Sequence, residues 1–248
     1  MNKIHKITRE IRNLLKEEVP VRNNKNAEWE KRILNSSDPA FLSYGLRVPQ
    51  LDSVALSITN QYEISYEEAL QIFKILINTH IHDEKMVTIS FISRFKKNFD
   101  EMIIDAYYNA LKNYCNTWAF CDSSMIKVLG PYLAKKENSA LAKKIIKAWA
   151  SSEHLWIKRA SMVIFLKRAM LHKNFNEDFL FKLAEDLRDD PEEYIQKAIG
   201  WMLKTCLKYK PDMVFKYLME NRMYFSRSTL RTACEKISAE MKNKILKL

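Results

Sequence analysis

The sequence predicts an all-α protein built from stacked pairs of helices. Three observations lead to this fold class. Apolar residues recur at helical spacing along almost the whole chain. Glycine is nearly absent, with only Gly45, Gly130 and Gly200 among 248 residues. Lys and Arg (41) outnumber Asp and Glu (30), for a net charge of +11 at pH 7.

The glycine count excludes several classes of protein. Loops that hold phosphate groups with the backbone need several clustered glycines, because glycine alone adopts positive φ freely and lets the backbone approach a ligand. A dinucleotide-binding fingerprint and a P-loop are therefore ruled out. Many-stranded β folds also need more turn glycines than three.

The first helices follow from apolar spacing and breaker residues. Ile4, Ile7 and Ile11 fall on one helical face, and we interpret residues 1–24 as a candidate N-terminal helical arm. The stretch from Glu18 to Asn26, which contains Pro20, is expected to be a linker or loop, and a short helix is expected over residues 27–36. The stretches 36–39 and 43–45 break the chain again.

Helix-start signals mark the middle of the chain. Pro49 suits the first position of a helix, where its missing N–H is not needed. Ser65 and Glu68 form a capping box. Asp83 is expected to begin a helix that runs to Phe95. Further helices are expected over residues 100–113 and from Asn116 to Gly130-Pro131.

The remaining helices are expected over residues 138–150, 153–171, 176–188, 191–209, 211–221 and 226–247, the last with a break. Asp190-Pro191 is interpreted as an N-cap followed by proline. Helix pairs recur every 35 to 45 residues or so, close to the HEAT-type period. We therefore predict one domain over residues 1–248, a HEAT-like helical-repeat solenoid (an α-α superhelix) with a basic concave face. A compact irregular helical bundle fits nearly as well.

Cysteine and histidine give no sign of a metal site. Cys115, Cys121, Cys206 and Cys234 form no C-x-x-C pair and have no histidines at zinc spacing. We expect buried free thiols, no metal and no cofactor. The N-terminus does not read as a signal peptide, and no apolar run is long enough to span a bilayer. The predicted location is the cytoplasm, with association to the nucleoid in a prokaryote.

The basic balance favours a polyanionic partner. Nucleic acid is the leading candidate and an anionic membrane the second. Solvated lysine-rich helix faces explain the charge equally well.

Three segments combine aromatic and charged residues. Trp118 and Asp122 lie one helical turn apart, so an indole and a carboxylate share a face that suits a cation. Taken alone, this segment has a simpler interpretation, in which Trp118 lies in the core and Asp122 pairs with a nearby lysine. In the second segment, Lys158 and Arg159 near a helix start suit phosphate contacts, whereas Trp156 is expected in the core.

The third segment runs from Tyr194 to Trp201. Ile195, Ile199, Met202 and Cys206 form its core stripe, and Trp201 lies off that stripe with Lys197, Lys204 and Lys208. This face suits DNA, although a gap-filling tryptophan beside solvated lysines fits as well. Gly200 in mid-helix predicts a close packing neighbour. Arg227 and Arg231, spaced four apart near Ser226 and Ser228, add a further basic surface.

These segments carry a family resemblance. WAFCD (118–122), LWIKRA (155–160) and YIQKAIGW (194–201), with the weaker YGLRVPQL (44–51) and FSRSTLRTACEKI (225–237), are similar to stretches of the AlkD-type DNA alkylation repair family, which are HEAT-repeat-like DNA glycosylases. The resemblance covers most of residues 27–237.

The resemblance implies a function. Such enzymes hydrolyse the N-glycosidic bond of positively charged N3- and N7-alkylated purines. Asp122 matches the carboxylate that stabilises the oxocarbenium-like sugar, and Trp118 and Trp201 match the aromatic pair flanking the lesion. Arg159 matches the arginine on the DNA backbone, and Tyr44 is the candidate for an N-terminal aromatic. Thr117 and Ala119 depart from the aromatic and acidic residues often found there.

We therefore predict a DNA glycosylase that acts as a monomer on double-stranded DNA containing alkylated bases, with no membrane role. Trp118, Asp122 and Trp201 are the candidate catalytic residues. The candidate DNA-binding residues are Arg159, Lys158, Lys197, Lys204, Arg227, Arg231 and Tyr44. A non-catalytic DNA-binding protein of the same fold and a helical-repeat scaffold for protein partners are the alternatives.

Overall fold

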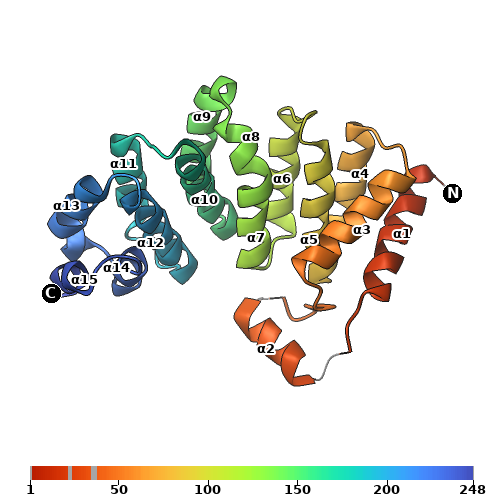
Figure 1. Cartoon of the computed structure of the whole chain (residues 1–248), viewed down its shortest axis with the longest axis horizontal. Helices are drawn as coiled ribbons and strands as arrows, with labels where there is room; N and C mark the ends of the chain where they lie inside the picture. Colours follow the sequence, from red (N-terminus) through yellow and green to blue (C-terminus); the bar gives the residue numbers. More distant parts are fainter. Residues whose placement is uncertain (1, 22–23, 35–37, 248) are drawn as a thin grey trace. The chain divides into compact units, whose positions relative to one another are not determined.

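A computed structural model describes residues 2–21, 24–34 and 38–247. These residues confirm the all-α prediction, since their only β feature is an isolated parallel bridge between Leu42 and Ile81. The structure falls into two compact units, the first ending at Val128 and the second beginning at Leu129. Within each unit, successive helices pack in a repeating pattern (Figure 1). The single continuous domain inferred from the sequence remains a prediction.

The first unit contains helices α1 to α7. Their bounds are α1 Lys3–Glu17, α2 Asn24–Leu34, α3 Val48–Gln61, α4 Tyr66–Ile77, α5 His82–Ile92, α6 Met102–Asn113 and α7 Trp118–Ser124, with a 3₁₀ turn Ser93–Phe95 after α5. Helix α5 packs against α3, α4 and α7, while α4 also contacts α1 and α6. The first turn of α5 also contacts the residues just before α7, because Lys85 donates a hydrogen bond to the Tyr114 carbonyl oxygen.

The N-terminal helix is part of this unit and not a separate arm. Ile4, Ile7, Ile11 and Leu15 are buried, and α1 packs against α3 and α4. The apolar stripe read from the sequence therefore faces the core of the first unit. Residues 35–36 of the predicted second helix lie outside the described residues, and α2 begins earlier than predicted.

The second unit contains the remaining helices. Their bounds are α8 Gly130–Ala134, α9 Ser139–Ala150, α10 Leu155–His172, α11 Glu177–Leu187, α12 Glu193–Leu207, α13 Pro211–Asn221, α14 Arg227–Ala233 and α15 Ala239–Leu246, with 3₁₀ turns Lys136–Asn138 and Arg222–Tyr224. A row of consecutive contacts joins α8, α10, α12 and α14, and α9 and α11 pack beside it. This alternation of helices between two layers is a helical-repeat fold.

Two predicted signals are confirmed in atomic detail. The Ser65 hydroxyl accepts a hydrogen bond from the Glu68 amide at 3.2 Å, and the Glu68 carboxylate accepts one from the Ser65 amide at 3.0 Å. Gly200 faces α14 so closely that a β-carbon there would lie 2.6 Å from the Thr229 carbonyl oxygen and from the Thr232 Cβ.

Two further predicted helix boundaries are wrong. The helix expected to end at Gly130-Pro131 passes through a π-helical segment, Met125–Leu129, and continues as α8. Pro131 is tolerated because it stands in the first turn after that segment, where its amide is not needed. Asp190-Pro191 does not open α12, which begins at Glu193.

The Asp190 carboxylate has another role. It accepts the Glu192 amide at 2.9 Å and pairs with Lys158, so it fixes the turn before α12. Elsewhere in the second unit, the expected break in the last helix is confirmed, because α15 starts afresh with Ser238 as its N-cap. Across the described residues, no helix is both long and apolar enough to cross a bilayer.

Candidate functional site

Two of the predicted site residues lie on α7, whose first turn is capped by Thr117. The Thr117 hydroxyl accepts a hydrogen bond from the Phe120 amide at 3.3 Å. Trp118 and Asp122 stand one helical turn apart and share a face. Asp122 is only 7% exposed, and Trp118 is half-buried. The helix thus places an indole and a shielded carboxylate on the same side.

The indole of Trp118 reaches across to α2. Its Nε1 donates a hydrogen bond to the Ile33 carbonyl oxygen at 3.0 Å. This carbonyl lies in the last turn of α2, where carbonyls lack partners within the helix. The contact fixes the edge of the indole ring and ties α2 to the start of α7.

A neutral thiol lies near Asp122. Burial raises the pKa of the Cys115 thiol to about 12, and the negative charge of Asp122 adds to this effect. The thiol donates weakly to the Thr117 carbonyl oxygen at 3.4 Å. Cys115 therefore stays protonated at neutral pH and adds no charge to the surroundings of the carboxylate.

The start of α5 supplies a buried cation that the sequence did not single out. Lys85 is buried, and its Nζ donates to the Tyr114 carbonyl oxygen at 2.7 Å, just before α7. Burial lowers the pKa of Lys85, while the negative charge of Asp38 acts in the opposite direction. The only signal in the sequence is the run of four polar residues from His82 to Lys85, and the structure shows that all four are buried at the start of α5.

Asp83 organises the loop between α2 and α3. Its Oδ2 accepts hydrogen bonds from the Ser43 hydroxyl at 3.0 Å and the Tyr44 amide at 2.6 Å, and its Oδ1 accepts the Leu46 amide at 2.8 Å. Gly45 turns the loop with a φ of 77°, a left-handed conformation that favours glycine. One buried carboxylate thus holds residues 43–46 against the start of α5.

Asp38 attaches the other end of this loop. Its carboxylate accepts the Ala40 amide at 2.9 Å and contacts His80 at 2.8 Å and the Asn116 amide group at 3.1 Å. Burial raises the pKa of Asp38, but these hydrogen bonds and the charge of His80 outweigh it and hold the pKa below its usual value. Asn116 thereby links the loop to the residues that precede α7.

Tyr44, the predicted N-terminal aromatic, lies against the acidic start of α5. Burial raises the pKa of its hydroxyl, and the charges of Glu84 and Asp83 raise it further. Glu84 also pairs with Arg12 at 2.9 Å. The Tyr44 hydroxyl is thus placed in contacts within the first unit, and its role on DNA remains a prediction.

In the second unit, the start of α10 packs onto the start of α12. The Arg159 guanidinium is buried, donates to the Tyr194 carbonyl oxygen at 2.5 Å and lies 5.8 Å from the centroid of the Tyr194 ring. Trp156 is buried as predicted, with its ring 5.3 Å from that of Tyr194. Lys158 pairs with Asp190 at 2.5 Å. These contacts hold both cations in place.

Helix α12 carries Trp201 half-buried, next to its core stripe. Ile195, Ile199, Met202 and Cys206 are fully buried, as predicted. Each of the two predicted lysines has an acidic partner, since Lys197 pairs with Glu193 and Lys204 with Glu235, both at 2.7 Å. Part of the positive charge that was predicted to bind DNA is therefore neutralised by carboxylates of the second unit.

Helix α14 presents the two predicted arginines. Both are exposed. Arg227 donates to the Leu246 carbonyl oxygen at 2.8 Å. Ser226 is the N-cap and accepts the Thr229 amide at 3.1 Å. The Ser226 oxygen is thus used to cap the helix.

Trp118, Asp122 and Tyr44 belong to the first unit, and the other predicted residues belong to the second. Their meeting on one face remains a prediction. Within the parts of the chain that the structure describes, no group of three His, Cys, Asp or Glu residues is arranged to hold a metal ion.

The family model for DNA alkylation repair enzymes matches residues 14–237 of this chain. The chain belongs to the DNA alkylation repair enzyme family. The match extends from α1 to the residues after α14 and includes every predicted site residue.

Two solved structures resemble this family member. A predicted DNA alkylation repair enzyme from Enterococcus faecalis has a TM-score of 0.73 at 19% identity, over 88% of this chain and 97% of that one. AlkD2 from Streptococcus mutans has a TM-score of 0.58 at 18% identity, over 86% and 99%. At these identities the likeness shows a shared fold. No curated protein matches the chain.

Proposed function

We propose that this DNA alkylation repair protein is a DNA glycosylase that hydrolyses the N-glycosidic bond of N3- and N7-alkylated purines. The observation that supports the proposal best is the shielded Asp122 carboxylate, one turn from Trp118 on the same face of α7. A family member without such a carboxylate would lack the negative charge that stabilises the positively charged sugar during the reaction.

The chemistry needs little more than this charge. An alkylated purine with a formal positive charge is a good leaving group, so the glycosidic bond breaks as the base departs as a neutral molecule. Positive charge then develops on the sugar, and a fixed carboxylate stabilises it. The oxygen of a water molecule bonds to the sugar carbon, and its proton passes to Asp122 or to solvent.

Aromatic and basic residues are proposed to hold the DNA. Trp118 and Trp201 would flank the lesion-bearing nucleotide, with Arg159 contacting the backbone. Arg227 and Arg231 would add phosphate contacts. To bind phosphates, the three lysines would have to give up their acidic partners. We therefore expect Lys158, Lys197 and Lys204 to contribute less to DNA affinity than the two arginines.

We propose double-stranded DNA containing alkylated bases as the partner, bound by a monomer in the cytoplasm. The net charge of +11 supports a polyanionic partner, because a basic surface attracts phosphate groups from a distance.

The test is incubation of the purified protein with duplex DNA carrying a single N7-methylguanine, and in a second reaction N3-methyladenine. Free base is measured by chromatography against a protein-free control. We expect release well above spontaneous depurination.

Binding to the same duplexes, measured in parallel, separates the alternatives. Binding without release from either lesion would overturn the glycosylase and favour a non-catalytic DNA-binding protein. Absence of binding would favour a scaffold for protein partners.

A further inference from the structure

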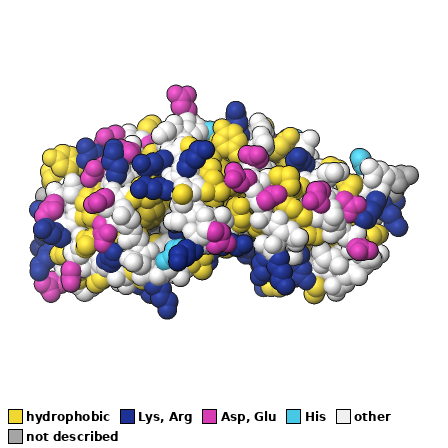
Figure 2. Space-filling view, turned by 90° about the horizontal axis from the view of Figure 1, so that it is seen from above, with side chains coloured by type: hydrophobic (Ala, Val, Ile, Leu, Met, Phe, Trp, Pro, Cys, Tyr) yellow, Lys and Arg dark blue, Asp and Glu magenta, His cyan; other side chains and the backbone are white. Residues whose placement is uncertain are grey.

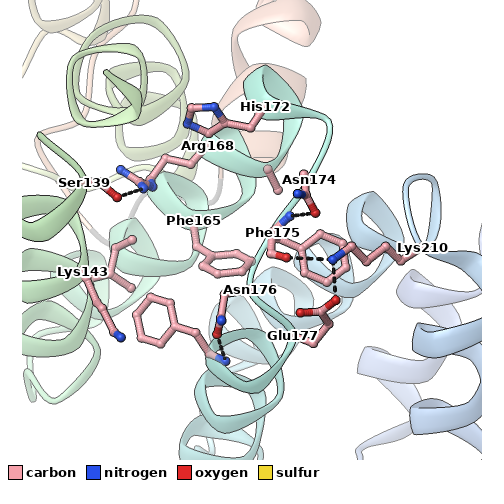
Figure 3. A pocket seen from close by; sticks show the side chains of 13 residues that line it. Ser139, Lys143, Phe165, Arg168, His172, Asn174, Phe175, Asn176, Glu177 and Lys210 are labelled. Carbon is pink, nitrogen blue, oxygen red and sulfur yellow. Dashed lines mark hydrogen bonds and ion pairs between the residues drawn. The ribbon is translucent and has the colours of Figure 1, made fainter. Parts of the chain in front are cut away.

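A cavity of about 790 Å³ opens between α9, α10 and α11, wholly within the second unit. Figure 3 shows Ser139, Lys143 and Arg168 on one side of it and Lys210 on the other, with Phe165 and Phe175 between them. The volume falls in the range of small-molecule sites, about 300 to 1,000 Å³. Its residues include none of the predicted site residues.

Aromatic rings form part of the wall. Phe165 lies 6.5 Å from Phe175 and 5.7 Å from Phe179, between ring centroids. Phe175 and Phe179 are half-buried, so part of each ring borders the cavity. The ammonium group of Lys143, which also lines the cavity, lies 5.9 Å from the Phe179 centroid. The wall therefore joins a ring surface to positive charge.

Arg168 brings a second cation to the cavity. Its guanidinium donates to the Leu133 carbonyl oxygen and, at 3.4 Å, to the Ser139 hydroxyl. It forms no ion pair with any carboxylate among the described residues, and burial lowers its pKa. A half-buried charge without a counter-ion is unfavourable, and a bound anion would relieve this cost.

The balance of charge around the cavity is positive. Lys143, Arg168 and Lys210 border it, against the single carboxylate of Glu177, which pairs with Lys210. Helix α9 carries three lysines and no acidic residue. In the space-filling view, several Lys and Arg side chains gather on the half that contains the second unit (Figure 2).

We propose that this cavity binds a nucleotide, with the base against Phe179 and Phe175 and the phosphate at Arg168 and Lys143. Aromatic side chains stack on any base, and Arg forms paired hydrogen bonds with phosphate oxygens. Inorganic phosphate would leave the rings unused, and an apolar ligand would leave the cations without a counter-ion. A compound with both an aromatic ring and a phosphate uses both features.

The site goes beyond the proposed glycosylase function and does not depend on it. Arg168 lies in the second half of α10, and Arg159 near its start. At 1.5 Å per residue, these positions are separated by roughly 13 Å along the helix axis. A nucleotide in the cavity would thus contact a different part of α10 from that assigned to the DNA backbone.

Titration calorimetry of the full chain tests the proposal. The probes are deoxyadenosine monophosphate, deoxyadenosine, inorganic phosphate and a short single-stranded oligothymidylate. We expect the mononucleotide to bind more tightly than either of its parts. Binding of the oligothymidylate alone, with the same dependence on Lys143, would identify a nucleotide within a strand as the source.

Matched variants locate the site. Lys143→Glu reverses a cavity charge, whereas Lys144→Glu makes the same change on the neighbouring residue of α9, which does not line the cavity. We expect about tenfold weaker binding for Lys143→Glu and little change for Lys144→Glu. Phe179→Leu keeps an apolar side chain but removes the ring, and should also weaken binding. Equal effects of the two lysine variants, or no binding of mononucleotide and oligothymidylate, would overturn the proposal.

Discussion

The indole Nε1 of Trp118 donates a hydrogen bond to the carbonyl oxygen of Ile33 at 3.0 Å. The first residue of α7 therefore holds the last turn of α2. On α2, the side chains of Trp29 and Ile33 are 57% and 44% exposed, so their burial contributes little to holding the helix in place. The hydrogen bond links the ordering of α2 to the residue proposed to contact DNA.

Trp118→Phe keeps a ring but removes this donor. A hydrogen bond of this kind contributes about 1 kcal/mol, so we expect amide hydrogen exchange over residues 24–34 to accelerate about fivefold. Exchange in α4 of the same variant serves as the internal control. An unchanged rate in α2 would show that the indole does not hold it.

Gly200→Ala should destabilise the second unit. The new methyl group would lie 2.6 Å from the backbone oxygen of Thr229, so α12 and α14 would have to separate. We expect a loss of about 1 to 3 kcal/mol in unfolding free energy, despite the higher helix propensity of alanine. Urea denaturation measures it, with the exposed Lys197→Ala as control. A variant as stable as the parent would contradict the close packing.

The features that the sequence predicted correctly depend on local rules. The capping box at Ser65 and the core stripe through Ile195 and Ile199 follow from spacing along one helix. Gly200 predicts a close neighbour because glycine is unfavourable in mid-helix, but only the structure identifies Thr229 as that neighbour.

The features that were missed depend on contacts between distant segments. Asp190 looked like a cap, but Lys158 lies close enough to compete for it, which no local pattern reveals. Asp83 organises a loop about forty residues earlier in the chain, and Lys85 binds a carbonyl before α7. The sequence predicts a helix end at Pro131 because the π-helical segment before it leaves no signature in the sequence.

His82 predicts a pH dependence of stability. Burial lowers its pKa from 6.5, with the charge of Asp83 acting in the opposite direction, and its Nδ1 is buried without a hydrogen-bond partner. The folded state therefore keeps His82 neutral at a pH where the unfolded chain binds a proton. The contribution of neutral His82 to the stability of the fold is therefore fully present above pH 6.5, and it is lost as the pH falls towards the pKa of the folded state.

Below pH 6.5, we expect the free energy of unfolding to fall by up to about 1.4 kcal/mol per pH unit. Urea denaturation between pH 5 and pH 7 (about the range that histidine titration covers) measures it in the parent and in His82→Gln. The variant should show a shallower slope. Identical slopes would mean that another group causes the pH dependence.

Arg231 and Lys158 should differ in their effect on DNA binding. Arg231 is exposed, whereas Lys158 pairs with Asp190 and its side chain is only 19% exposed. The logarithm of DNA affinity falls as the logarithm of salt concentration rises, and removing one phosphate contact makes this slope less steep by about one. We expect this change for Arg231→Ala and a smaller one for Lys158→Ala. The reverse order, measured by fluorescence anisotropy over a salt series, would show that DNA displaces Asp190.

The most direct test of the proposed function is the single-turnover rate of N7-methylguanine release by Asp122→Asn compared with the parent. Asp105→Asn, the same change at an exposed position on α6, is the matched control. The amide keeps the shape of the side chain but not its charge, so we predict a loss of about 100- to 1,000-fold for Asp122→Asn, with DNA binding retained. The control should match the parent. An Asp122→Asn variant that releases the base at the parental rate would contradict the role of this carboxylate and the mechanism that depends on it.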